Sequence, residues 1–133
     1  MTRSLLRLLL AALYFVAGYF HLAEPDPFLR ISPSWVPFPQ VVVFWTGIAE
    51  FAGAAALLQP WSDRLRHAGA MGLAIYALCV WPANFNHLLI DLASEDGGWG
   101  LTYHVPRLLA QPLLIWLALW CGQVIDWPFR KGA

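Results

Sequence analysis

Long apolar stretches alternate with short polar segments along this chain. Four of the stretches are long enough to cross a membrane, at residues 5–22, 41–59, 68–90 and 105–125. An α-helix rises about 1.5 Å per residue and the hydrocarbon core of a bilayer is about 30 Å thick, so roughly 20 apolar residues suffice for one crossing. The pattern therefore predicts an all-α integral membrane bundle of four transmembrane helices, which forms a single domain over residues 1–133.

A short apolar segment interrupts the first polar connection, residues 23–40. Asp26 followed by Pro27 is typical of a helix start, because an N-cap oxygen then precedes a proline at the first helical position. Phe28 and Leu29 make this turn apolar, and the prolines that follow prevent a long helix. We expect a short interfacial helix at the membrane surface, which serves either as an anchor or as a lid over the bundle.

Basic residues indicate the orientation of the four helices. Cytoplasmic loops of membrane proteins are enriched in lysine and arginine, and six of the eight basic residues fall in the segments expected on one side. These six are Arg3, Arg7, Arg64, Arg66, Arg130 and Lys131. The sequence thus predicts a multi-pass protein of the inner (plasma) membrane with both termini in the cytoplasm, whose connections 23–40 and 91–104 face outward.

The composition agrees with a membrane location. The chain is 59% hydrophobic and 12% charged, against about 25% charged residues in an ordinary soluble domain. Eight basic and eight acidic residues cancel, so no net field recruits nucleic acid. The two cysteines, Cys79 and Cys121, are expected at different depths and therefore unbridged. Small residues four apart, such as Ala68 and Gly72, predict close contacts between helices.

Polar residues gather in the outer halves of the predicted helices. Glu50 lies about ten residues into the second stretch and hence roughly 15 Å deep, near the midplane. A charge at that depth costs about 3 kcal/mol even on permissive insertion scales, so a functional role is the favoured explanation. Helical spacing places further polar groups on shared faces at the same end of the bundle. The candidate catalytic residues are Glu50, His21 and His87, and the candidate ligand-binding residues are Tyr14, Thr46, Asn84, His104, Arg107 and Gln111.

The depth of these residues favours a pocket that opens to the outside. A channel needs polar lining in both halves of the membrane, and here the inner half has little. Single asparagine, glutamine and threonine residues also serve as hydrogen-bond partners between membrane helices without any further role. A metal site built from the histidines and Glu50 is disfavoured, because no pair of them has ligand spacing on one helix and the set spans about 10 Å of depth. We expect no metal.

Several short motifs resemble those of DoxX-like membrane proteins. They are Gly18-Tyr19-Phe20-His21, Trp35-Val36-Pro37-Phe38-Pro39, Gly47-Ile48-Ala49-Glu50, Pro82-Ala83-Asn84 and Arg107-Leu108-Leu109-Ala110-Gln111-Pro112-Leu113. The resemblance covers residues 14–125 and implies a four-helix membrane bundle. Some DoxX-like proteins are subunits associated with quinone-linked oxidation of sulfur compounds, and others assemble with secreted redox enzymes at the membrane. By this resemblance His21, Glu50, Asn84 and Arg107 match positions that recur in the family.

The leading hypothesis is a redox-linked subunit, at most part of a membrane oxidoreductase, whose outer-half pocket binds a quinone or another small amphipathic molecule. Glu50 would exchange a proton with the ligand or bind a quinone oxygen, aided by His21 or His87, while Arg107 would stabilise partial negative charge. Two alternatives stay open. One is a non-enzymatic scaffold in the lipid bilayer that docks partner redox proteins or a second copy of itself, and the other is a carrier or sensor for a small lipophile.

Overall fold

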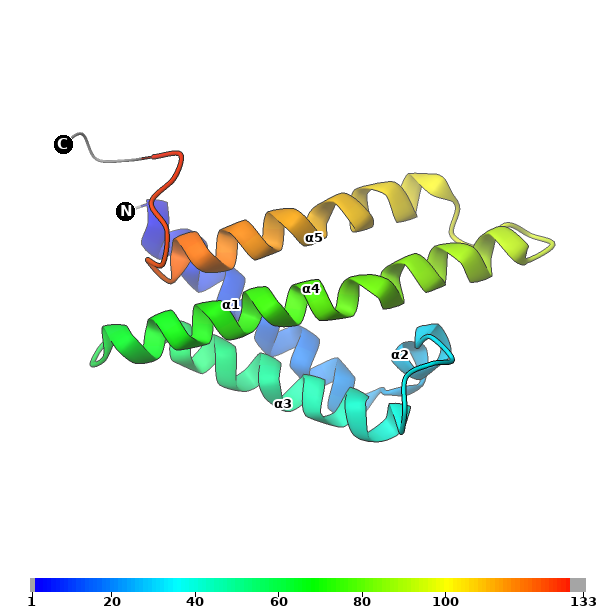
Figure 1. Ribbon diagram of the computed structural model, residues 1–133, viewed down its shortest axis with the longest axis horizontal. Coiled ribbons are helices and arrows are strands. Elements are labelled where there is room, and N and C mark those ends of the chain that lie inside the picture. The colour runs from blue at the N-terminus through cyan, green and yellow to red at the C-terminus, as the bar shows by residue number, and fades with distance from the viewer. Residues whose placement is uncertain (1, 130–133) are drawn as a thin grey trace.

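The computed structural model describes residues 2–129, which form five helices and no strands, so the predicted all-α class is confirmed. The helices are α1 (Thr2–Ala23), α2 (Asp26–Ile31), α3 (Pro39–Leu58), α4 (Asp63–Ala93) and α5 (Leu101–Cys121). The four long helices run along the length of the molecule, and the short α2 lies at one end beside α3 and α4 (Figure 1). The same end carries the connection between α4 and α5.

Three helices, α1, α3 and α4, are long and apolar enough to cross a membrane. Their outward faces carry large apolar side chains such as Leu9, Ile75 and Leu89, which are 56%, 63% and 63% exposed. Exposed apolar side chains on this scale are typical of a surface that lipid covers. Helix α5 has a similar length of 21 residues but is not one of these three, and Arg107 and Gln111 lie in it together with two prolines.

Small residues let neighbouring helices approach closely. Helix α1 packs on α3, α3 on α4, and α4 on α5. A Cβ atom on Gly18 would lie 2.9 Å from the carbonyl oxygen of Gly47, so these two glycines bring the backbones of α1 and α3 together. The predicted contact at Ala68 and Gly72 is wrong, because Gly72 has open space beside it. Gly69, one residue earlier, is the glycine of α4 that contacts α3, since it lies on the face turned toward that helix.

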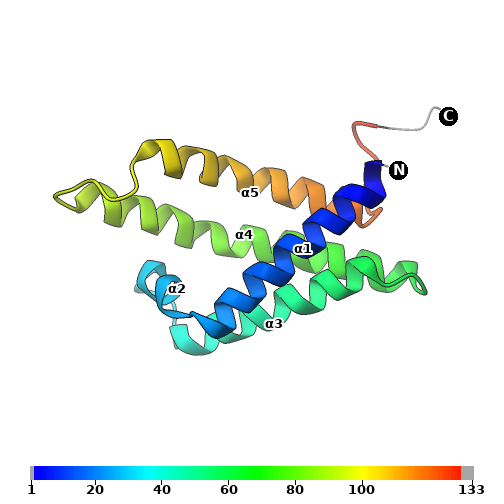
Figure 2. The same cartoon turned by 180° about the vertical axis from the view of Figure 1, so that it is seen from behind.

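The first and last described segments lie at the same end of the bundle as the turn between α3 and α4 (Figures 1 and 2). The Arg3 guanidinium forms an ion pair with Asp126 at 2.6 Å, and Nε of Arg7 donates to the carbonyl oxygen of Cys121 at 2.9 Å. These contacts tie the start of α1 to the end of α5. Cys121 is buried, Cys79 is exposed, and both thiols are free.

At the opposite end, the predicted short helix is present as α2, but its cap differs from the prediction. Asp26 is the first helical residue, Pro25 occupies the N-cap position, and no side chain caps the helix. The predicted N-cap role of Asp26 is therefore wrong, because the chain turns into the helix one residue earlier than the Asp-Pro pattern suggests. The side-chain amide of Asn86 on α4 donates to the carbonyl oxygen of Ile31 at 2.9 Å, which holds α2 against the bundle.

The connection between α4 and α5 is fixed by hydrogen bonds to two carboxylates. Asp91 accepts the backbone N–H of Trp99 at 2.8 Å, and Asp96 accepts the N–H of Gly98 and the hydroxyl of Ser94, both at 3.0 Å. The hydrogen bonds from Gly98 and Ser94 hold the pKa of Asp96 below its usual value, because they stabilise the charged form. This connection therefore carries negative charge at neutral pH.

Candidate functional site

A cavity of about 340 Å³ lies among all five helices at the end of the bundle that α2 covers. Its volume falls within the range of about 300–1,000 Å³ that small-molecule pockets have. Most of its wall is apolar, with Leu13, Ile31 and Val43 among the lining residues, and the thiol-bearing Cys79 also lines it. The polar lining residues are Tyr14, His21, Ser32, Thr46, Glu50, Tyr76, Asn84, Arg107 and Gln111.

Glu50 is the one acidic residue that lines this cavity, and it is only 2% exposed. The Tyr76 hydroxyl donates to its Oε1 at 2.7 Å. Nδ1 of His21 lies 2.9 Å from Oε2, but it lies equally close to the carbonyl oxygen of Ala17, toward which its N–H is directed. Oε2 therefore has a cationic or polar neighbour but no well-aligned donor. A buried acceptor of this kind at a cavity wall can accept a hydrogen bond from a ligand.

Aromatic rings surround the carboxylate and its partners. The Tyr14 and Tyr76 rings meet edge to face with their centroids 6.2 Å apart, and the Tyr14 hydroxyl is buried without a partner. Phe28 of α2 stacks on the His21 imidazole at a centroid distance of 3.7 Å, so α2 roofs the cavity at this point. The Thr46 hydroxyl is committed to its own helix, because it donates to the Val43 carbonyl oxygen at 2.6 Å.

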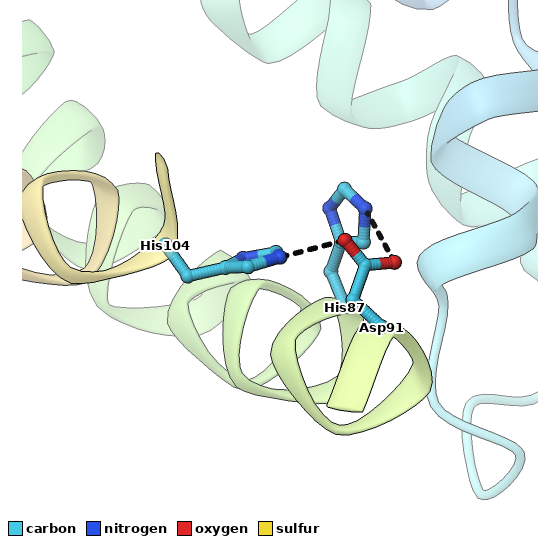
Figure 3. A group of neighbouring side chains, drawn as sticks. All are labelled: His87, Asp91 and His104. Carbon is cyan, nitrogen blue, oxygen red and sulfur yellow. Dashed lines mark hydrogen bonds and ion pairs between the residues drawn. The ribbon is translucent and has the colours of Figure 1, made fainter. Parts of the chain in front are cut away.

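A second polar cluster lies beside the cavity, at the junction of α4 and α5. It consists of His87, Asp91 and His104, which Figure 3 shows with the carboxylate between the two imidazoles. Nε2 of His104 lies 2.8 Å from Oδ2 of Asp91, and Nε2 of His87 lies 3.6 Å from Oδ1. Arg107 connects this cluster to the cavity, because its guanidinium lines the cavity and also donates to Nδ1 of His87 at 2.6 Å.

The nine residues proposed from the sequence thus divide between the two places. The seven that line the cavity are Glu50, His21, Tyr14, Thr46, Asn84, Arg107 and Gln111. His87 and His104 lie in the second cluster instead, and neither contacts Glu50. Sequence reasoning missed Tyr76 as a partner of Glu50. Its position eight residues before Asn84 places both on one face of α4, and this spacing was the available signal.

Residues 10–122 match the family model described as a domain of unknown function (DUF8561). The match covers most of the chain, so the chain belongs to this family. No curated protein and no solved structure matches the chain. The resemblance to DoxX-like proteins stays a prediction.

Proposed function

We propose that this member of the DUF8561 family is a multi-pass protein of the inner (plasma) membrane that binds a small amphipathic molecule in the cavity, with a quinone as the first candidate. The observation that carries the proposal is the Glu50 carboxylate, which is buried at the cavity wall with one oxygen held by Tyr76 and the other without an aligned donor. A protein seldom buries a carboxylate in a membrane-spanning helix unless the group has a function.

The placement of the polar residues of α5 supports four crossings with both termini in the cytoplasm. Arg107 and Gln111 line the cavity, so they need not face lipid although they lower the mean hydropathy of α5. The basic residues Arg3, Arg7 and Arg66 lie at the end opposite to α2. By the positive-inside rule this end faces the cytoplasm, and the cavity opens in the outer half of the membrane.

The cavity has the donors and acceptors that a quinone head group requires. The two carbonyl oxygens of a quinone accept hydrogen bonds, and the Arg107 guanidinium and the free Tyr14 hydroxyl are donors in the lining. The reduced form carries hydroxyl groups, for which Oε2 of Glu50 is an acceptor. The apolar side chains that make up most of the wall suit the ring and the first part of an isoprenoid tail. We therefore assign the chain a binding role as a subunit of a quinone-linked membrane oxidoreductase.

Titration of purified protein with a short-chain ubiquinone analogue tests the proposal, with tryptophan fluorescence as the readout. Glu50→Gln should weaken binding of the reduced analogue about tenfold, since a lost hydrogen bond to a charged group is worth at least about 1.4 kcal/mol. Ala83→Leu, which adds bulk to the cavity wall, should also weaken it. The matched controls are Glu95→Gln and Ala52→Leu, both at exposed positions outside the lining.

Two outcomes would contradict the proposal. Equal affinity of the wild type and Glu50→Gln would remove the carboxylate from the binding site. Equal affinity of the wild type and Ala83→Leu would place the ligand outside the cavity. Mass spectrometry of the lipids that co-purify in mild detergent then decides the ligand class, because a quinone in the wild-type extract that is missing from the Ala83→Leu extract supports the assignment.

A further inference from the structure

Three side chains with metal-ligating atoms converge where α4 ends and α5 begins. His87 and Asp91 lie one helical turn apart on α4, and His104 lies in the first turn of α5. One ligating atom from each lies within 4.8 Å of the other two, and Figure 3 shows the two imidazoles approaching the carboxylate from different directions. We propose that His87, Asp91 and His104 form a binding site for a divalent transition-metal ion such as Zn²⁺.

The ligand set and its dimensions fit such an ion. Two imidazole nitrogens and one carboxylate oxygen suit zinc, iron or copper, whereas magnesium and calcium prefer oxygen ligands alone. In a tetrahedral zinc site with bonds of about 2.0–2.2 Å, neighbouring ligand atoms lie about 3.3–3.6 Å apart. Nε2 of His104 lies 2.8 Å from Oδ2 of Asp91 and Nε2 of His87 lies 3.6 Å from Oδ1, so small shifts bring both imidazoles to this separation from a carboxylate that uses both oxygens. Three protein ligands leave a fourth position for water or a substrate.

The surroundings hold the ligands in place and supply negative charge. The His104 side chain is 1% exposed and that of Asp91 is 12% exposed, so both are fixed by packing. The Trp99 N–H orients the Asp91 carboxylate, as hydrogen bonds from outside the ligand set commonly do in metal sites. A Cβ atom on Gly98 would overlap this carboxylate, so the loop backbone closes directly over it. Glu95 and Asp96 follow in the same loop and favour the approach of a cation.

Arg107 competes with the ion for His87. An arginine can only donate, so Nδ1 of His87 accepts this bond and a neutral ring carries its proton on Nε2. An ion bound at Nε2 requires the proton to move to Nδ1, which breaks the bond to Arg107. The same tautomer change at His104 moves its proton to Nδ1, which has no partner at present. Metal binding therefore releases the Arg107 guanidinium, which already borders the cavity.

Titration of metal-free protein in detergent with Co²⁺ tests the site, because nitrogen and oxygen ligands around tetrahedral Co²⁺ give strong visible absorption, and Zn²⁺ should displace the cobalt. We expect saturation at one ion per chain. Asp91→Asn and His104→Gln should each weaken binding at least about tenfold. Arg107→Gln should tighten binding, since it removes both the competing hydrogen bond and a nearby positive charge. Asp26→Asn and His67→Gln are the matched controls, because neither residue belongs to the ligand set or to the loop that closes over it.

Absence of saturable Co²⁺ binding to the wild type would overturn the proposal, and so would unchanged affinity in His104→Gln. The three side chains would then form a hydrogen-bonded latch only. Asp91→Asn retains an acceptor oxygen for Trp99 and His104, and a thermal melt of each variant identifies any that fails to fold. If a ligand variant fails to fold, Arg107→Gln decides: tighter Co²⁺ binding supports the metal site, and unchanged or weaker binding overturns it. Glu50 is not one of the three metal ligands, so the two proposals fail separately. A chain that binds cobalt but no quinone supports the metal site and refutes the quinone site.

Discussion

Substitution of Tyr76 by phenylalanine removes a single hydroxyl group from the contact between α3 and α4. That hydroxyl donates to Oε1 of Glu50 at 2.7 Å. The ring that remains keeps its edge-to-face contact with Tyr14. Because Oε2 of Glu50 already lacks an aligned donor, the variant leaves a buried carboxylate with no aligned protein donor on either oxygen. The change therefore isolates the contribution of one hydrogen bond to the stability of the protein.

Two ranges bound the expected loss of unfolding free energy. Hydrogen bonds to charged groups contribute about 1.5–3 kcal/mol in soluble proteins. Interhelical hydrogen bonds in a membrane protein average about 0.6 kcal/mol and reach about 1.7 kcal/mol. The Glu50 side chain is 3% exposed, so its bond belongs at the upper end of the membrane range. We expect Tyr76→Phe to lower the unfolding free energy by about 1.5 kcal/mol, measured by circular dichroism as SDS replaces a mild detergent.

Measuring Tyr76→Phe also in the Glu50→Gln variant separates the hydrogen bond from other effects of the substitution. In Glu50→Gln the acceptor is neutral, so Tyr76→Phe should cost only about 0.6 kcal/mol there. Tyr19→Phe controls for the loss of a phenol hydroxyl, because Tyr19 is 59% exposed and no hydrogen bond involves its hydroxyl in the described part of the chain. Equal costs of Tyr76→Phe in the two backgrounds would refute the coupling between Tyr76 and the charge of Glu50, and so would a wild-type cost below about 0.5 kcal/mol.

Glycine substitutions test two close approaches of the backbone to neighbouring side chains by the same unfolding assay. Gly47→Ala should destabilise the protein by about 1–3 kcal/mol, because its Cβ would lie 3.0 Å from the Cβ of His21. Gly72→Ala, which has open space beside it, should be neutral or stabilising. Equal effects of the two substitutions would argue against close packing of α1 and α3. Gly98→Ala should lower the unfolding free energy more than Gly97→Ala. Both glycines have positive φ, but only a Cβ at position 98 meets the Asp91 carboxylate. The reverse order would contradict a loop that closes over Asp91.

The helices could be predicted from the sequence because apolar length determines them almost alone. The four predicted stretches correspond to α1, α3, α4 and α5, and the prolines of residues 33–39 correctly limit α2 to one short helix. Boundaries were less predictable. Helix α4 starts at Asp63 and ends at Ala93, several residues beyond the apolar stretch at each end, because Ser62 caps its first turn and the helix continues through polar residues.

For the site residues, the sequence predicts which face of its own helix each one occupies, but not its partner on another helix. Helical spacing places Asn84 and His87 on one side of α4, but it does not determine which residue of another helix each one meets. His87 lies about one turn nearer the end of α4 than Asn84, and there Arg107 and Asp91 are its neighbours. Tyr76 reaches Glu50 because α3 and α4 are antiparallel neighbours at that level, which is a property of tertiary packing rather than of local sequence.

The native thiols make the cavity accessible to chemical labelling without any substitution. Cys79 borders the cavity and is exposed on the surface of α4, whereas Cys121 is fully buried. A maleimide fluorophore should therefore modify the folded protein at one position only. Because the reactive form is the thiolate, the labelling rate at Cys79 in detergent depends on water in the cavity and should fall when a ligand fills that space.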